Sequence, residues 1–382
     1  MFRGGTPLIS MGDRADRPSI VVLFPDDWAS YSPTLTRLVA LLSERFEVRA
    51  WVLDTGRFDL QALDSTQYRR IGIPAAAATF LRKCGIMPLA RWLLLPWRSR
   101  GAPRWARDVV AVDAGGAVAA ALLGRRFHYL SLEIRRWSIV RWLVPRRALS
   151  IVIQSQQRLQ FQFSAASLRE TPVFMLQNAP NFRETPDLAA PLRDLSRPRL
   201  VYMGNVIPGH GLLRMLDLLQ AWPEASLTIH GALSPATREM IEQRYPGLVT
   251  QQRLQLSTAY LHDSEIIPFL SGFDLGLCLY ELEGRMRTDY NYISSPAGKM
   301  FNYFAAGIPV IASPLAGLDP VSVHGAGLQA ASNSVHDLRH AADAICADYP
   351  RYRQGALEAA REYDFATAAG AFAGFLARSG AP

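Results

Sequence analysis

The sequence predicts an α/β protein that consists of two tandem Rossmann-like, doubly wound domains. Two series of alternating strand and helix signals follow one another along the chain, and a stretch rich in proline and charge separates them. The 382 residues, 49% of them hydrophobic, are enough for two ordinary domains with a buried core each. Because such sheets bind ligands at the carboxyl ends of their strands, we expect the site in a central cleft that the two domains face.

The first domain is expected over residues 19–180, after a flexible N-terminus over residues 1–18. It opens with a continuous apolar run, SIVVLFP, followed by a helical pattern, PTLTRLVALLSERF, and a second strand-like run, EVRAWVLD. This βαβ order implies a parallel sheet. Further candidates for buried strands are Asp108–Asp113, Phe127–Glu133, Leu149–Ser155 and Val173–Ala179.

The second domain is expected over residues 199–382, after a linker over residues 181–198 that is rich in proline and charge and has no convincing period. Its series reads LVYMGN strand, GLLRMLDLLQAW helix, ASLTIHG strand, ATREMIEQRY helix, LQLST strand, SEIIPFLSG helix and FDLGLCLY strand. A further helix, the strand PVIAS and C-terminal helices complete the domain. Two series of this length predict two sheets with helices on both faces.

The net charge of +8 conceals a division along the chain. Residues 1–200 carry 29 Arg and Lys against 16 Asp and Glu, whereas residues 201–382 carry 12 against 17. Between Arg69 and Arg147 there are 16 basic residues and three acidic ones. The N-terminal excess is therefore concentrated in one stretch.

Tryptophan residues are interleaved with arginine in this basic stretch. Indole rings lie at the headgroup level of a bilayer and guanidinium groups bind lipid phosphate, so the stretch is expected to contact a lipid acceptor or an anionic membrane surface. Packing of the tryptophans in the core, with solvated arginines, is the alternative. Nucleic-acid binding is not expected, because no helix-turn-helix, zinc-finger or RNP pattern is present. The acceptor or membrane candidates are Trp92, Trp97, Asp113, Arg135, Arg136 and Trp137, with Trp142 beside them.

The three cysteines and the apolar runs exclude several protein classes. The cysteines lie far apart without a CxxC pair, so neither a disulfide framework nor a zinc site is encoded. The longest apolar run, WLLLPW, is far below the roughly 20 residues that span a bilayer. The N-terminal residues lack the apolar core and cleavage site of a signal peptide. We expect a cytoplasmic protein, peripherally associated with the inner face of the plasma membrane.

Lys299 is one of only two lysines among 41 basic residues. The pattern around it predicts a helix over Pro296–Ala306, with Ser295 as N-cap and Gly307 as the residue that ends it. Lys299, Asn302 and Tyr303 are spaced i, i+3 and i+4 along this helix. A lysine in the first turn adds a compact charge where free backbone N–H groups already favour an anion. The pattern predicts a phosphate site; an exposed lysine on a packed helix is the alternative.

Six stretches of the sequence resemble GT-B glycosyltransferases. SSPAGKMFNYFAAGIPVIAS, residues 294–313, resembles their donor-site element, commonly written S-P-x-K-x-x-E-Y-x-A-x-G-x-P-V-I. RLVYMGNVIPGHGL resembles the first strand and glycine-rich turn of the same domain, and SEIIPFLSGFDLGLCLY resembles the stretch before the nucleotide pocket. WARDVVAVDAGGAVAAAL, YLSLE and VFMLQNAP resemble acceptor-domain segments of bacterial polysaccharide enzymes. The likeness covers most of the chain from Ile20, strongly in the second domain and loosely in the first.

The resemblance implies transfer of a sugar from a nucleotide diphosphate donor, linked to UDP or GDP, that the second domain binds. Lys299 and the Ser295 turn would contact the diphosphate, Gly204 and Asn205 would form the floor near phosphate and sugar, and Tyr280 would flank the base. Positive charge there stabilises the departing diphosphate. The donor-binding residues so implied are Gly204, Asn205, His210, Tyr280, Ser295, Lys299, Asn302 and Tyr303.

The sequence departs from the family pattern in two features. Many retaining members carry two glutamates eight positions apart around this helix, where this chain has Ser294 and Asn302. An amide at the second position is a similarity to the xanthan glucuronosyltransferase, and it can form a hydrogen bond with a ribose hydroxyl. Without the glutamates, the resemblance does not imply that the anomeric configuration is retained. Many members also have a lysine after the glycine turn, where this chain offers His210 or Arg214 for a second phosphate contact.

An inverting enzyme needs a carboxylate base within hydrogen-bond reach of the acceptor hydroxyl. Glu133 is the first candidate, because it ends the strand FHYLSLE in a strongly basic neighbourhood. His128, within the same strand, is expected to be structural. Each candidate acid could instead cap a helix or lie in a solvated turn. Other acids that follow strands at the expected cleft edge are Asp26, Asp27 and Asp113.

The leading interpretation is a glycosyltransferase that acts on a lipid-linked glycan precursor in bacterial cell-envelope or exopolysaccharide biosynthesis. A nucleotide-sugar 2-epimerase on the same fold and an inactive donor-binding scaffold subunit are the alternatives. The nucleotide sugar is a co-substrate, and no cofactor is expected. Because no Asp-x-Asp motif occurs, no catalytic metal is expected either.

Overall fold

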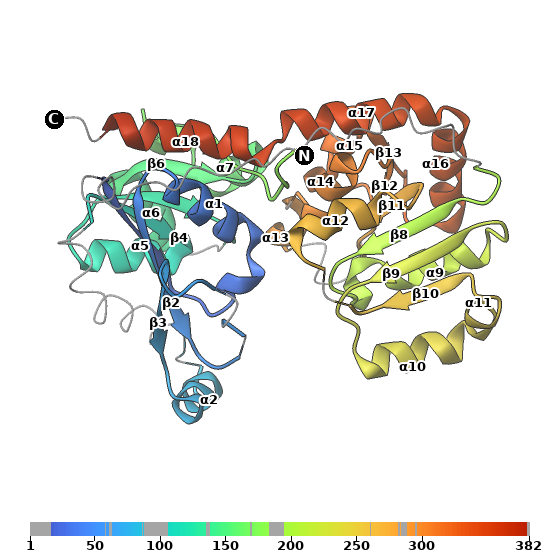
Figure 1. Cartoon of the computed structure of the whole chain (residues 1–382), viewed down its shortest axis with the longest axis horizontal. Coiled ribbons are helices and arrows are strands. Elements are labelled where there is room, and N and C mark those ends of the chain that lie inside the picture. The colour runs from blue at the N-terminus through green and yellow to red at the C-terminus, as the bar shows by residue number, and fades with distance from the viewer. Residues whose placement is uncertain are drawn as a thin grey trace, which may run out of the picture. The chain divides into compact units, whose positions relative to one another are not determined.

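The computed structural model describes residues 17–57, 59–60, 63–85, 87, 106–134, 138–168, 170–182, 195–259, 261–281, 283, 289–294 and 296–379. The chain forms two compact units. The first unit contains Met1–Ile153, Leu159–Leu176 and Ala368–Pro382, and the second contains Gln154–Arg158 and Gln177–Thr367. Each unit has its own parallel sheet (Figure 1).

The sheet of the first unit has seven strands in the order β3-β2-β1-β4-β5-β6-β7. Its pairings are parallel, and β1 lies between β2 and β4, with Ile20 beside both Val48 and Asp108. This is the Rossmann order, in which the sheet is wound in opposite directions on either side of β1 and β4. The strands are β1 Ser19–Phe24, β2 Glu47–Asp54, β3 Tyr68–Gly72, β4 Asp108–Val112, β5 Phe127–Ser131, β6 Ala148–Ile153 and β7 Val173–Met175.

Helices cover this sheet because their apolar residues recur at helical spacing. In α1 the Ser32 side chain accepts a hydrogen bond from the Leu35 N–H, Pro33 occupies the first turn, and Leu38 and Leu42 are buried. The helices that contribute to this unit are α1 Pro33–Ser43, α2 Ala75–Lys83, α5 Asp113–Leu122, α6 Ser138–Arg147, α7 Gln156–Gln162, α8 Ala165–Leu168 and α18 Phe365–Ser379, with a short 3₁₀ helix at Ala29–Tyr31.

The sheet of the second unit repeats the same order with six strands, β10-β9-β8-β11-β12-β13. Its pairings are also parallel, so the reversal of winding falls between β8 and β11. Its strands are β8 Arg199–Met203, β9 Ser226–His230, β10 Leu254–Ser257, β11 Leu275–Cys278, β12 Val310–Ala312 and β13 Gly327–Gln329.

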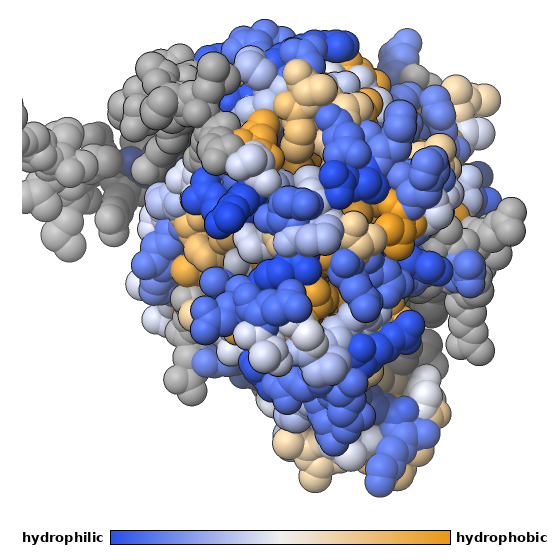
Figure 2. All heavy atoms as spheres, turned by 90° about the vertical axis from the view of Figure 1, so that its right-hand side faces the viewer, coloured by the Kyte–Doolittle hydropathy of each residue, from blue (hydrophilic) through white to orange (hydrophobic). Residues whose placement is uncertain are grey.

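The helices of the second unit lie on both faces of its sheet, and their apolar faces form two clusters of buried residues. Figure 2 shows one face of the molecule, where hydrophobic residues are scattered among hydrophilic ones. The helices are α9 Leu212–Gln220, α10 Pro235–Arg244, α11 Pro246–Thr250, α12 Asp263–Leu270, α13 Tyr290–Ser294, α14 Gly298–Ala305, α15 Pro320–Val323, α16 Val335–Ala347 and α17 Tyr349–Glu362, with 3₁₀ helices at Pro208–His210 and Ala316–Leu318.

The structure confirms the predicted fold class and changes the predicted division of the chain. Residues 199–382 do not all belong to the second unit, because the chain from Ala368 joins the first. The reason is packing: Phe372 and Phe375 of α18 lie against Phe174, with ring centroids 5.5 and 5.3 Å apart. Most of the expected N-terminal segment and residues 183–194 of the expected linker lie outside the described residues.

No helix within the described part of the chain is both long and apolar enough to cross a bilayer.

Candidate active site

The predicted donor-binding residues gather where the winding of the second sheet reverses. Gly204 follows β8, and Tyr280 follows the neighbouring strand β11. Lys299 lies at the start of α14, the helix that precedes β12. In open α/β sheets this edge is where ligands bind, because the loops on the two sides of the reversal diverge and leave a crevice.

The turn after β8 requires glycine. Gly204 has a φ of +136°, and a Cβ there would lie 3.3 Å from Lys299 Cε. Gly211, which ends the turn, has a φ of +68°, and a Cβ there would lie 2.7 Å from Leu279 Cβ. Both positions disfavour other residues, so the glycines bring the turn close to the lysine and to the end of β11.

The helix of Lys299 begins later than the sequence predicts. Its N-cap is Ala297, without a side-chain hydrogen bond, and not Ser295, which lies outside the described residues. The predicted end is confirmed: Gly307 has a φ of +64°, and the N–H groups of Gly307 and Ile308 donate to the carbonyls of Phe304 and Tyr303. Lys299 is thus the second residue of α14, where unpaired N–H groups are concentrated.

Two tyrosine rings enclose the ammonium group of Lys299. Its Nζ lies 4.2 Å from the ring centroid of Tyr202 and 5.0 Å from that of Tyr280, and it donates a 3.1 Å hydrogen bond to the Tyr202 hydroxyl. The aromatic faces stabilise the cation. Burial nevertheless lowers the pKa of Lys299 to about 8. The ammonium is charged at neutral pH, and its deprotonation is within reach of mildly alkaline pH.

Hydrogen bonds connect this lysine to the glycine turn. The Tyr202 hydroxyl donates to the carbonyl oxygen of Asn205 at 2.7 Å. His210 Nδ1 lies 2.9 Å from the same oxygen and 3.2 Å from the Tyr202 hydroxyl. Burial, followed by the nearby charge of Lys299, lowers the pKa of His210 to about 4. Lys299, Asn205 and His210 therefore belong to one network, and Lys299 carries its charge at neutral pH.

The backbone of Tyr280 is anchored from the neighbouring strand. Its N–H donates to Ser313 Oγ at 2.9 Å, and its carbonyl accepts from Asn333 Nδ2 at 2.6 Å. Ser313 Oγ in turn donates to Asn333 Oδ1 at 2.7 Å. The ring of Tyr280 packs edge-on against His210, with centroids 5.2 Å apart. These contacts hold the ring beside the lysine.

Arg214 has a different environment from the lysine. Its guanidinium lies 3.6 Å from a carboxylate oxygen of Glu281 and 4.0 Å from one of Glu283. Two carboxylates therefore compensate its charge, which makes it a poor second contact for a phosphate.

Asn302 and Tyr303 follow Lys299 along α14, but they occupy different environments. Asn302 is half-buried, one turn from the lysine. Tyr303 is fully buried against β11, and its hydroxyl accepts a 2.9 Å hydrogen bond from the Met203 N–H. Tyr303 thus supports the end of β8 from the core side, and the hydroxyl that the sequence assigns to donor binding is engaged with the main chain.

The carboxyl edge of the first sheet carries the predicted acids. Asp26 and Asp27 follow β1, Asp113 follows β4, and Glu133 follows β5. Because β1, β4 and β5 are consecutive in the sheet, these acids share one edge. Asp27 is buried and accepts a hydrogen bond from the Thr55 hydroxyl, whereas Asp26 and Glu133 are half-buried. The two half-buried acids are the better placed to meet a ligand.

Asp113 holds the loop that contains Glu133. Its Oδ1 accepts hydrogen bonds from the backbone N–H groups of Leu132 at 2.8 Å and Glu133 at 2.9 Å. Asp113 has a φ of +53°, a strained conformation for a residue with a side chain. We interpret Asp113 as a residue that positions Glu133.

Some of the other predicted residues lie outside the described part of the chain, and His128 and Trp142 lie within it. Trp92, Trp97, Arg135, Arg136 and Trp137 lie outside the described residues. His128 is completely buried, with Nδ1 2.9 Å from Ser150 Oγ, as expected for a structural histidine. On α6 the residue Trp142 is 58% exposed, and the guanidinium of Arg146 lies over its ring, 4.8 Å from the ring centroid.

Sequence reasoning missed Tyr202 and Tyr292. Tyr202 of β8 belongs to the buried cluster on the face of the sheet that α9 covers, whereas α14 packs in the cluster on the other face. The period of a strand therefore gives no signal that the Lys299 side chain reaches the Tyr202 hydroxyl. Tyr292 of α13 packs edge-on against Tyr280 at 4.9 Å, a contact that no local pattern indicates.

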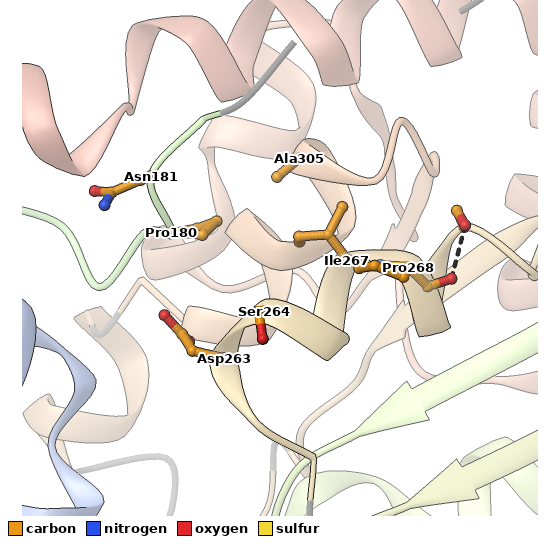
Figure 3. Close-up of a pocket in the computed structure, with 8 residues that line it drawn as sticks. Pro180, Asn181, Asp263, Ser264, Ile267, Pro268 and Ala305 are labelled. Atoms are coloured by element: carbon orange, nitrogen blue, oxygen red, sulfur yellow. Dashed lines mark hydrogen bonds between the residues drawn. The ribbon is translucent and has the colours of Figure 1, made fainter. Parts of the chain in front are cut away.

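A separate pocket of about 550 Å³ lies elsewhere in the second unit (Figure 3). Its lining comes from the segment after β7, from α12 and the residue that follows it, and from α14: Pro180, Asn181, Asp263, Ser264, Ile267, Pro268, Ser271 and Ala305. Ala305 is six residues beyond Lys299, about 9 Å along the helix axis. None of the predicted site residues lines this pocket.

Comparison with solved structures identifies the architecture. HepE of Anabaena, in complex with UDP, superposes with a TM-score of 0.66 and 14% identity over 94% of this chain and 100% of that one. Sucrose-phosphate synthase of Thermosynechococcus elongatus superposes with a TM-score of 0.68 and 15% identity, over 95% of this chain and 99% of that one. The fold is GT-B. A putative UDP-N-acetylglucosamine 2-epimerase of Listeria monocytogenes shares this fold. It superposes with a TM-score of 0.59 and 15% identity, over 93% of this chain and 94% of that one.

No family model and no curated protein sequence matches the chain. The TM-scores establish the GT-B fold, whereas identities of 14–15% leave the reaction to be argued from the site. Within the described residues, no group of three or more His, Cys, Asp or Glu side chains is arranged to hold a metal ion.

Proposed function

We propose that this protein is a glycosyltransferase that moves a sugar from a nucleotide diphosphate, UDP- or GDP-linked, to a lipid-linked glycan acceptor. The observation that carries the proposal is the enclosed ammonium of Lys299 at the start of α14, beside the glycine turn after β8. A cation and free helix N–H groups at one point favour a diphosphate. The complexes of HepE with UDP and with UDP-glucose support a nucleotide-sugar ligand for this GT-B chain.

The reaction assigned to these residues is a displacement at the anomeric carbon. The acceptor hydroxyl oxygen attacks that carbon while its proton passes to a carboxylate, for which Glu133 is the first candidate and Asp26 the second. The bond from the anomeric carbon to the phosphate oxygen breaks, and the nucleotide diphosphate leaves with the electron pair. Lys299 and the N-terminal N–H groups of α14 stabilise the negative charge that develops.

The acceptor is assigned to a lipid because of the first unit's surface. Trp142 and Arg146 present an indole ring and a guanidinium together on the exposed side of α6, the combination suited to a bilayer interface with anionic headgroups. We propose that the enzyme is cytoplasmic, works at the inner face of the plasma membrane and contributes to envelope or exopolysaccharide biosynthesis. No metal or other cofactor takes part in this proposal.

A nucleotide-sugar 2-epimerase is the second candidate, and a specific observation favours it: the Listeria structure named above has the same fold over 93% of this chain. An inactive donor-binding scaffold is the third, since Ser294 and Asn302 stand where many retaining members carry two glutamates. The exposed Trp142 and Arg146 favour the transferase, because epimerisation of a soluble nucleotide sugar requires no membrane surface.

Incubation with radiolabelled nucleotide sugars and extracted bacterial lipid separates the three functions. We expect label in the lipid fraction. An altered free nucleotide sugar would establish the epimerase instead, and binding without turnover would establish the scaffold. Omitting the lipid extract is the matched control, since only the transferase depends on it.

A further inference from the structure

The hydrogen bonds around the turn after β8 determine where their protons lie. The ammonium of Lys299 has no lone pair, so it donates to the Tyr202 oxygen at 3.1 Å. The Tyr202 hydroxyl donates to the carbonyl oxygen of Asn205 at 2.7 Å. A carbonyl oxygen has two lone pairs and can only accept, so His210 Nδ1, 2.9 Å from the same oxygen, carries a proton.

A neutral His210 with its proton on Nδ1 has an unprotonated Nε2. The titratable groups that surround the ring are Lys299 of α14, Tyr202 of β8, Tyr280 after β11 and Tyr292 of α13. Among the described residues, no carboxylate pairs with the ring to retain a second proton, and burial together with the Lys299 charge lowers the pKa of His210 to about 4. At neutral pH the ring is therefore an uncharged acceptor at Nε2.

We propose that His210 is a specificity-determining residue whose Nε2 accepts a hydrogen bond from a hydroxyl group of the nucleotide sugar. This inference rests on the proposed nucleotide-sugar site. The hydrogen bonds of the ring lie at Nδ1, and within the described part of the chain Nε2 has no hydrogen-bond partner. A phosphate oxygen is itself an acceptor and would meet this lone pair unfavourably, whereas a hydroxyl supplies the missing donor.

The tautomer of His210 changes the role that the sequence suggests for this residue. Sequence reasoning offered His210 as a second cation for the diphosphate, but its tautomer leaves that task to Lys299 and the helix N–H groups. The hydroxyl can belong to the ribose or to the transferred sugar. Both present the same chemistry to Nε2, and they differ in which ligand loses affinity when His210 is removed.

The first test is ¹⁵N NMR of the histidine rings in the free protein. The signals of His210 are identified as those that are missing from the spectrum of His210→Gln. We expect a neutral ring with the proton on Nδ1 that does not titrate between pH 6 and 8. A proton on Nε2, or a charged ring at pH 7, would overturn the proposal. This measurement needs no ligand, so it is independent of the proposed function.

The second test measures binding of inorganic pyrophosphate, UDP and UDP-glucose to the unmodified protein, His210→Ala and His210→Gln. Loss of one neutral hydrogen bond should weaken a hydroxyl-bearing ligand roughly two- to tenfold in His210→Ala. Pyrophosphate, which has no hydroxyl, should bind unchanged. The side-chain oxygen of His210→Gln can accept a hydrogen bond and should restore part of the affinity. His340→Ala, an exposed position on α16, is the matched control.

The changes in affinity for pyrophosphate, UDP and UDP-glucose decide whether the hydroxyl belongs to the ribose or to the transferred sugar. Equal losses for UDP and UDP-glucose assign the ribose hydroxyls, and a loss for UDP-glucose alone assigns the sugar. A loss for pyrophosphate as large as that for UDP, or unchanged UDP-glucose affinity in His210→Ala, would overturn the proposal. Failure of these three probes and of GDP to bind the unmodified protein would instead contradict the proposed function, while the NMR result would still report the tautomer.

Discussion

The two sheets have the same strand order, but their carboxyl edges carry opposite chemistry. The edge of the first sheet presents the acids Asp26, Asp113 and Glu133, and that of the second presents Lys299 and aromatic rings. The Rossmann order explains why both edges are suited to ligands. The side chains explain the difference: carboxylates can take a proton from a hydroxyl, and an enclosed ammonium can hold an anion.

The charge of each edge is also opposite to that of the chain around it. The acids lie within residues 1–200, where 29 basic residues outnumber 16 acidic ones, and Lys299 lies within residues 201–382, where 17 acidic residues outnumber 12 basic ones. The overall charge of a domain therefore bears on its surface and partners, whereas a few positioned groups determine its chemistry.

The largest effect is expected on the acidic edge. Glu133→Gln keeps the size of the side chain and removes the general base, so transfer should fall by about 10²- to 10⁴-fold. Binding of UDP should not change, since Glu133 belongs to the other sheet. The measurement is initial transfer rate to extracted lipid together with calorimetric titration by UDP. Full activity in Glu133→Gln, with loss in the control Asp26→Asn, would transfer the role to Asp26.

Lys299→Ala tests the cationic edge. Removal of a charged hydrogen-bond donor should weaken UDP or GDP binding by about 1.5–3 kcal/mol, roughly 10- to 150-fold. Lys299→Arg should restore binding only partly, because the guanidinium group is wider than the ammonium group. The space beside Gly204 is narrow: a Cβ at that position would lie only 3.3 Å from Lys299 Cε. Thermal unfolding should show all three proteins folded. Unchanged calorimetric affinity in the alanine variant would remove the basis of the donor site.

The pH dependence of the same lysine should act on binding and stability in opposite directions. Burial lowers the pKa of Lys299 to about 8 from an ordinary 10.5. UDP affinity should therefore fall above pH 8, by at most about tenfold per pH unit, as the ammonium loses its proton. Between about pH 8 and 10.5 the unfolded chain binds this proton more strongly than the folded chain, so the lysine's contribution to stability should rise with pH.

Lys299→Met is the control for this pH prediction. Both trends should disappear in it, because methionine has no titrating group. Calorimetry and urea unfolding across pH 7–10.5 measure the two trends. A UDP affinity of the unmodified protein that stays constant to pH 10 would contradict the assigned role of the ammonium.

The smallest effect is expected at the surface of the first unit. The protein should sediment with anionic vesicles more than with neutral ones, and the difference should shrink with added salt. Arg146→Ala should lower the anionic partition by roughly fivefold, about 1 kcal/mol for one arginine near the surface. Arg351→Ala, an exposed arginine on α17, should not change it. Equal sedimentation with both vesicle types would argue against membrane association.

The sequence by itself determined the fold class and the elements on which most of the predicted donor-binding residues lie. Continuous apolar runs and helical periods along the chain specify buried parallel strands and their covering helices, so β2 has the predicted bounds Glu47–Asp54. The helix of Lys299 was predictable from Pro296 and Gly307, because proline and glycine constrain the local backbone, although it begins at Gly298 and not at Pro296. These are properties of neighbouring residues and need no knowledge of distant contacts.

Only the tertiary structure decided which side chains meet. Lys299 donates a hydrogen bond to Tyr202, 97 positions away, and Asp113 accepts one from the N–H of Glu133 after the neighbouring strand, because strand order brings these segments together. The same holds for the C-terminal chain from Ala368, whose aromatic rings pack on the first unit. The tautomer of His210 follows from a carbonyl oxygen that no sequence pattern directs at it. Local propensity determines where elements form, and long-range packing determines the proton positions and pKa values on which the chemistry depends.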